Sequence, residues 1–145
     1  MSVGETRLII PVLGPLYRIL GGCGEALLRI LCGALLLAPG WHKLTGPLFD
    51  RDLQLFHQLG LEPALLLMWF ITALELGGGV LLIVGLLTRP IALMVAVEML
   101  VIAFAVDIPS GRGYSFTLLW AAVAVTIALR GGGKLSLDRL IGREF

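Results

Sequence analysis

The sequence predicts an all-α membrane protein, specifically an antiparallel bundle of four transmembrane helices. The composition is 58% hydrophobic and only 14% charged, whereas soluble domains carry about 25% charged residues. The mean hydropathy is +0.98. Apolar runs long enough to cross a bilayer alternate with short segments that contain Gly, Pro or charged residues. The chain is expected to form a single transmembrane domain, residues 1–145, with no room for a second, soluble domain.

The first crossing is expected at about residues 25–40. Pro39 and Gly40 are expected to end it, and Trp41 then lies where membrane aromatics gather, at the interface. This stretch is short for a crossing, so preceding glycines can contribute to it.

An apolar stretch at residues 8–20 precedes this crossing. It is interrupted by prolines and is too short to span a bilayer, so we interpret it as an N-terminal interfacial segment. A lipoprotein signal that ends before Cys23 is the alternative interpretation. Arg18, close to the cleavage point of such a signal, disfavours it.

The remaining elements follow in order. Residues 48–60 predict a short amphipathic helix on the membrane surface, because apolar positions recur along one helical face. Three further crossings are expected at about residues 63–87, 91–106 and 114–129. The sharpest turn is expected at residues 88–90, between the second and third crossings.

Glycines and alanines are expected where crossings touch, since lipid removes the usual hydrophobic drive between helices. On the second crossing the candidates are Gly77, Gly78 and Gly85. A phosphate-binding loop is disfavoured for this run, because it lies inside the membrane.

The basic residues predict the orientation. With four crossings, one side collects eight of the eleven Lys and Arg residues: Arg7, Arg18, Arg29, Arg89, Arg130, Lys134, Arg139 and Arg143. The other side holds Lys43, Arg51 and Arg112. By the positive-inside rule, both termini are expected in the cytoplasm. The near-neutral charge, with no long basic run, excludes nucleic acid as a partner.

Charged residues within the crossings are the candidate site residues, because a charge at bilayer depth is costly and faces the protein interior. Glu75 is the principal candidate, as a hydrogen-bond donor or proton carrier. Arg29 and Glu98 are expected to pair with each other, although Glu25 competes for Arg29 at helical spacing. His42 and Lys43 are expected at the outer mouth, and if Lys43 does not reach Glu75 that carboxyl is expected to be neutral.

The cysteines and histidines suggest no metal site. Cys23 and Cys32 lie about 13 Å apart along a continuous helix, too far for a disulfide. Two isolated histidines add no recognised ligand set, so no metal is expected.

The sequence resembles the DoxX family of small bacterial and archaeal four-helix membrane proteins. The matching segments are LLRILCGALLLAPGWHKL from Leu27, LELGGGVLLIVGLLTRPIALMVAVEMLV from Leu74 and LLWAAVAVTIALRGGGKLSLD from Leu118. Arg29, Lys43, Glu75 and Arg89 match positions of the family pattern. The chain departs from it at Ser115, where many members carry a glutamate.

The resemblance implies redox chemistry at the cytoplasmic membrane of a bacterium or archaeon, including thiosulfate:quinone oxidoreductases. The leading hypothesis is therefore a quinone-interacting subunit of a membrane oxidoreductase, with quinone as the cofactor and electrons from a partner. The alternative is a non-catalytic structural or assembly subunit, and whether the chain is an enzyme stays open. Expected partners are the lipid bilayer and either further copies of the chain or a larger membrane complex.

Overall fold

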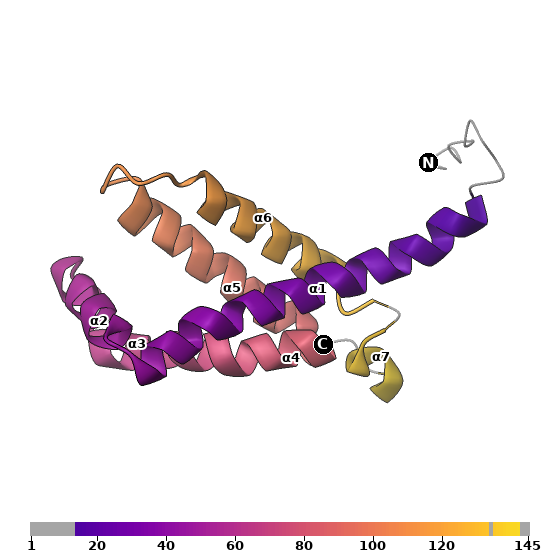
Figure 1. The fold of residues 1–145 in the computed structure, drawn as a ribbon, viewed down its shortest axis with the longest axis horizontal. Coiled ribbons are helices and arrows are strands. Elements are labelled where there is room, and N and C mark those ends of the chain that lie inside the picture. Colours follow the sequence, from indigo (N-terminus) through magenta and orange to yellow (C-terminus); the bar gives the residue numbers. More distant parts are fainter. Residues whose placement is uncertain (1–13, 134, 143–145) are drawn as a thin grey trace.

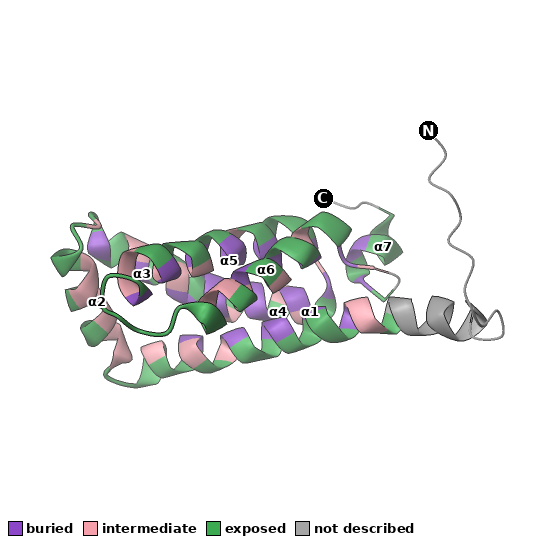
Figure 2. Cartoon of the chain, turned by 90° about the horizontal axis from the view of Figure 1, so that it is seen from above, coloured by how far each residue is buried: buried purple, intermediate pink, exposed green. Residues whose placement is uncertain are grey.

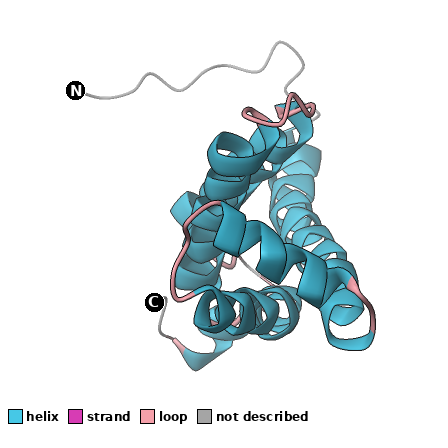
Figure 3. Ribbon diagram, turned by 90° about the vertical axis from the view of Figure 1, so that its left-hand side faces the viewer, coloured by secondary structure: helices cyan, strands magenta, loops and turns pink. Residues whose placement is uncertain are grey.

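The computed structural model describes residues 14–133 and 135–142, and within these ranges the chain is helical, with no strand. The elements in order are α1 (Gly14–Thr45), α2 (Leu48–Gln58), α3 (Ala64–Ala73), the π-helical turn η2 (Leu74–Gly78), α4 (Gly79–Val84), α5 (Thr88–Ile102), the π-helical turn η3 (Ala103–Asp107), α6 (Ser115–Arg130) and α7 (Leu137–Ile141). Figure 3 shows the helices from the end where α2 lies. The predicted surface helix is present as α2.

Three segments in the described part of the chain are long and apolar enough to cross a membrane: residues 23–45, 64–84 and 88–107. Helix α6 is apolar but has only 16 residues, about 24 Å of helix. The chain is therefore a membrane protein, and lipid covers the large apolar side chains that face outward. Figure 2 shows these exposed outer faces and the buried residues that face one another between helices.

Helix α1 is longer than predicted. It spans 32 residues with Pro39 inside it, so the expected end at Pro39 and Gly40 is wrong. A proline removes one backbone hydrogen bond from a helix, a loss that transmembrane helices tolerate. Residues 8–13 of the expected interfacial segment lie outside the described residues, and from Gly14 onward the segment belongs to α1, whose first turns project past the bundle in Figure 1.

The turn between the second and third crossings lies earlier than predicted. Gly85 and Leu87 both adopt left-handed backbone angles, with φ of 76° and 52°. Thr88 already begins α5, and Pro90 lies in its first turn, where the missing N–H of a proline has no helical partner to lose. The turn therefore occupies residues 85–87 rather than 88–90.

The helices form two pairs. Helix α1 packs along α4, and α5 packs along α6. The pairs meet near the α4–α5 turn and diverge toward α2, as Figure 1 shows. The apolar core lies where they meet and includes Leu36, Leu82, Val95 and Ala124. This divergence leaves space at the α2 end.

Glycines set the close contact between α1 and α4. A Cβ atom at Gly33 would lie 2.5 Å from the Gly79 carbonyl oxygen, and one at Gly79 would lie 2.9 Å from the Gly33 carbonyl oxygen. The two backbones therefore touch at this point. Gly77 was expected in this contact, but a Cβ atom there would have no heavy atom of a described neighbour within 4 Å. That prediction is wrong, whereas Gly78 and Gly85 do meet neighbours.

Candidate functional site

Lys43 and Glu75 form a buried ion pair. Lys43 lies in the last turn of α1, and Glu75 lies in η2. The Lys43 Nζ atom donates to Glu75 Oε1 at 2.8 Å, and the two side chains are 10% and 5% exposed. The extension of α1 past Pro39 carries Lys43 to this position. The contact that the sequence left open is therefore made.

Asp52 joins this pair from α2. Its Oδ2 atom lies 4.0 Å from Lys43 Nζ. Sequence reasoning missed this residue. A signal was present, because Asp52 is four residues from both Leu48 and Phe56, which puts an acidic group on the apolar face of the surface helix.

Glu98 lies on α5 with an exposed fraction of 7%. Neither of its carboxyl oxygens has a hydrogen-bond partner among the described residues, and Glu75 Oε2 also lacks one. Glu98 interacts electrostatically with Glu75 and Lys43. A buried polar group without a partner is costly, so these three oxygens are candidates for contact with a hydrogen-bonding group.

A cavity of about 630 Å³ lies beside these residues, between the two helix pairs. Its wall is mostly apolar and is formed by Leu55, Phe56, Leu61, Leu67, Phe70, Ile71, Leu74, Leu93, Met94, Val97, Val101, Ile102 and Val106. Several of these side chains, among them Phe70 and Val97, are also exposed on the outside of the protein. The cavity is therefore accessible along this wall rather than sealed inside the apolar core.

Charged residues also line the cavity. They are Lys43, Asp52, Glu98, Asp107 and Arg112. Asp107 lies in η3, where the hydroxyl of Thr117 donates to its Oδ2 at 2.6 Å. Asp107 and Arg112 were not predicted as site residues, because they fall at the end of a crossing, where charges are ordinary. Both π-helical turns contain a buried acidic residue, Glu75 in η2 and Asp107 in η3, and such turns are frequent at functional sites.

The predicted pair of Arg29 and Glu98 does not form. The guanidinium of Arg29 donates to the carbonyl oxygens of Leu82 at 2.7 Å, Ile83 at 3.2 Å and Leu135 at 2.8 Å. The prediction failed because it placed the cytoplasmic end of the first crossing at residue 25. Arg29 in fact lies level with the end of α4. Glu98 lies about 15 Å along α5 from Thr88, the first residue of that helix.

Arg29 instead belongs to a structural clasp at the α7 end. Asp138 accepts hydrogen bonds from the backbone N–H groups of Leu87 at 2.8 Å and Thr88 at 3.0 Å. Its own N–H donates to the Gly85 carbonyl oxygen at 2.9 Å. Asp138 therefore caps the start of α5 from the far end of the chain, and Arg29 ties the same C-terminal segment to α4.

The remaining candidate residues lie away from the cavity or make other contacts. Glu25 pairs with Arg130, with 3.4 Å between Oε1 and Nε. His42 is exposed and does not line the cavity. Cys23 is exposed and Cys32 is buried, and both are free. Within the described residues, no group of three His, Cys, Asp or Glu side chains is placed to hold a metal ion.

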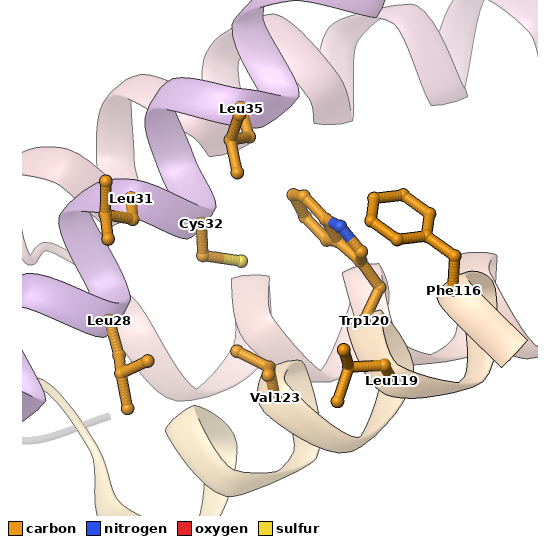
Figure 4. A pocket seen from close by; sticks show the side chains of 8 residues that line it. All are labelled: Leu28, Leu31, Cys32, Leu35, Phe116, Leu119, Trp120 and Val123. Carbon is orange, nitrogen blue, oxygen red and sulfur yellow. The ribbon is translucent and has the colours of Figure 1, made fainter.

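A second, smaller cavity of about 160 Å³ lies between α1 and α6. Figure 4 shows its lining, which includes Cys32, Leu35 and Trp120. Among the residues that the structure describes, no acidic or basic one contributes to this lining. The large cavity therefore differs from the small one in having an ionisable wall.

Comparisons with known proteins place the chain in a family. A family model described as DoxX matches residues 24–108. The chain is 28% identical over 127 residues to "Inner membrane protein YqjF" of Escherichia coli (strain K12), which covers 84% of this chain and 95% of that protein. It is 29% identical over 120 residues to a protein of Bacillus subtilis (strain 168) named "Putative oxidoreductase CatD", which covers 81% of this chain and 87% of that protein. No solved structure matches the chain. Because the family model covers more than half of the sequence, the chain belongs to the DoxX family.

Proposed function

We propose that the protein is a quinone-interacting subunit of an oxidoreductase in the bacterial inner membrane. In this proposal α6 makes a fourth crossing and both termini are cytoplasmic, as the basic residues predict. A relative named as an inner membrane protein and another named as an oxidoreductase support the location and the reaction class. Electrons come from a partner subunit.

One observation carries the proposal. Both carboxyl oxygens of Glu98 are buried without a partner among the described residues, in the wall of a largely apolar cavity. The cavity volume of about 630 Å³ falls within the range of about 300–1,000 Å³ typical of small-molecule sites. A quinone fits this wall because its ring and tail are apolar and its two carbonyl oxygens accept hydrogen bonds.

The residues of the cavity have distinct roles in this proposal. A protonated Glu98 donates a hydrogen bond to one quinone carbonyl. Lys43 holds Glu75 in place and, with Arg112, supplies positive charge near the head of the ligand. Phe70 and Val97 line the lipid side, where a lipophile enters from the bilayer. A bound quinone accepts two electrons and two protons, and the carboxyl groups hold protons beside it.

The test measures the quinone that remains bound after mild-detergent purification of the full chain with its native lipids. Glu98→Leu is expected to weaken quinone binding about tenfold, since one buried hydrogen bond to a charged or polar group contributes about 1.5 kcal/mol. Val97→Trp is expected to fill the cavity and abolish binding. Val125→Trp is the matched control, because Val125 is also lipid-facing but lies outside the cavity lining.

The alternative function, a structural or assembly subunit, predicts a different result. The protein would then co-purify stoichiometrically with a larger membrane enzyme, contain no quinone, and tolerate both cavity substitutions. Equal quinone content in the Val97→Trp and Val125→Trp variants would also contradict the proposed site.

A further inference from the structure

Three ionisable side chains lead from the surface at α2 to the buried carboxyl groups. The exposed fraction of the side chain is 32% for Asp52 and 10% for Lys43, and it falls to 5% for Glu75. Lys43 Nζ lies 4.0 Å from Asp52 Oδ2 and 2.8 Å from Glu75 Oε1. One contact is a direct hydrogen bond, and the other is a distance that a bridging water can span.

The opposite direction is closed by apolar side chains. The apolar core that adjoins the cavity includes Leu82, Ala92, Val95 and Ala124, each with an exposed fraction of 0%. Neither α4 nor the described part of the C-terminal segment, α7 included, lines the cavity. The lipid-facing wall is also apolar and offers no proton donor among the described residues. We therefore expect water to reach the buried carboxyl groups from the α2 end.

Charged groups from several elements line the same cavity as Glu98. Helix α1 contributes Lys43, α2 contributes Asp52, η3 contributes Asp107 and the following loop contributes Arg112. Asp107 accepts from Thr117 of α6, so one of its oxygens is already occupied. Asp52 is the acidic residue in contact with the Lys43–Glu75 pair.

We propose that Asp52, Lys43 and Glu75 form a proton-exchange route that connects the buried carboxyl groups with the solution at the α2 end alone. A hydronium ion at the surface protonates the Asp52 carboxylate. The Lys43 ammonium gives its hydrogen-bonded proton to the Glu75 carboxylate, and the Asp52 carboxyl group then returns a proton to the neutral Lys43 amine. Only O–H and N–H bonds form and break, so one proton moves inward without any oxidant or reductant.

This route deepens the proposed function, and its physiological role rests on that function. Reduction of a quinone consumes protons, and the route determines from which side of the membrane they come. Glu98 lines the same cavity as Lys43 and Asp52, and in the proposed function it is the group that donates to the ligand.

The test follows the protonation of Glu75 and Glu98 in proteoliposomes that contain the full chain and no quinone. Dicyclohexylcarbodiimide, which enters lipid and modifies protonated carboxyl groups, is the probe, and mass spectrometry measures the adducts. A C-terminal tag accessible to protease reports which way each preparation faces. A pH jump is applied to one side of the membrane at a time. Labelling is expected to increase when the pH is lowered on the α2 side and to stay unchanged when the pH is lowered on the α7 side.

Variants separate the route from a structural effect. Asp52→Asn is expected to slow the response to the pH jump by at least about tenfold, in keeping with loss of a proton-transfer group. Asp52→Glu is expected to restore it. Asp50→Asn is the matched control, because Asp50 is an exposed acid on the same helix. Labelling that follows the α7 side, or Asp52→Asn behaving like Asp50→Asn, would overturn the route. The labelling experiment contains no quinone, so it tests the route independently of the proposed function. If labelling follows the α2 side but the purified protein binds no quinone, the proposed function is rejected and the route is retained.

Discussion

Lys43 and Glu75 join the end of the first crossing to the π-helical turn of the second through an ion pair of 2.8 Å. Both side chains are almost fully buried. Removal of one partner leaves a charge without compensation in a region that lipid surrounds, and this costs more than removal of both.

Substitutions at this pair test whether it stabilises the fold. Lys43→Met is expected to lower the free energy of unfolding by about 3 kcal/mol or more. The double variant Lys43→Met with Glu75→Gln is expected to recover part of this loss. Reversible unfolding in mixed micelles measures both. A double variant that is less stable than Lys43→Met alone would show that the two residues do not compensate each other.

The contacts of Arg29 predict a different pattern. Arg29→Leu removes three hydrogen bonds to carbonyl oxygens of α4 and the C-terminal segment. A loss of about 3 kcal/mol in unfolding free energy is expected, at about 1 kcal/mol for each bond. Because Glu98 is not its partner, adding Glu98→Leu is expected to give no recovery. Rescue of Arg29→Leu by Glu98→Leu, measured in the same micelles, would contradict the assignment.

The glycines of α1, η2 and α4 offer a matched comparison. Gly33→Ala or Gly79→Ala pushes a methyl group against a backbone carbonyl oxygen of the facing helix, and a destabilisation of about 1–3 kcal/mol is expected. Gly77→Ala points into open space and is expected to be neutral or stabilising by about 0.5–1 kcal/mol. Thermal unfolding of the three purified variants measures the order. Equal effects at Gly77 and Gly79 would exclude the proposed close contact of α1 and α4.

Glu62 gives a pH-dependent prediction at the surface. The N–H of Ala64 donates to its carboxylate at 3.0 Å and His57 contacts it at 2.6 Å, and these contacts lower the pKa of Glu62 from its ordinary value of 4.5. A lowered pKa in the folded state means that the contribution to stability is present above pH 4.5 and is lost as the pH falls through the folded value. Glu62→Gln is therefore expected to lower the melting temperature at pH 7 and to have a smaller effect as the pH falls below 4.5. A difference that persists unchanged in acid, in thermal scans of both proteins, would contradict this linkage.

Much of the architecture could be predicted from the sequence because bilayer thickness constrains it. Apolar runs located three segments long enough to cross a membrane, and the amphipathic pattern located α2. The ends of helices were less certain, since Pro39 normally signals a helix end and the membrane context tolerates it. The single extension of α1 to Thr45 changed the depth of Arg29 and brought Lys43 to Glu75.

The site was predicted less completely than the fold. Glu75 and Glu98 were proposed from the cost of charge in lipid and Lys43 from its place just beyond the first crossing, and the structure places all three within electrostatic reach of one another. Asp52 and Asp107 could not be identified in the same way, because a charge at a helix end or on a surface helix carries no such cost. Their contribution depends on how the two helix pairs diverge, which is a property of tertiary packing.

Photo-crosslinking with an azido-quinone, followed by peptide mapping, tests the central proposal most directly. Adducts are expected on the lining of the large cavity, around Phe70 and Val97, and Glu98→Leu is expected to reduce their yield. The small cavity between α1 and α6 serves as an internal control, because its described lining contains no carboxyl group and no Lys, Arg or His side chain. Adducts confined to Trp120 and its neighbours, or spread evenly over the lipid-facing surface, would contradict a quinone site at Glu98.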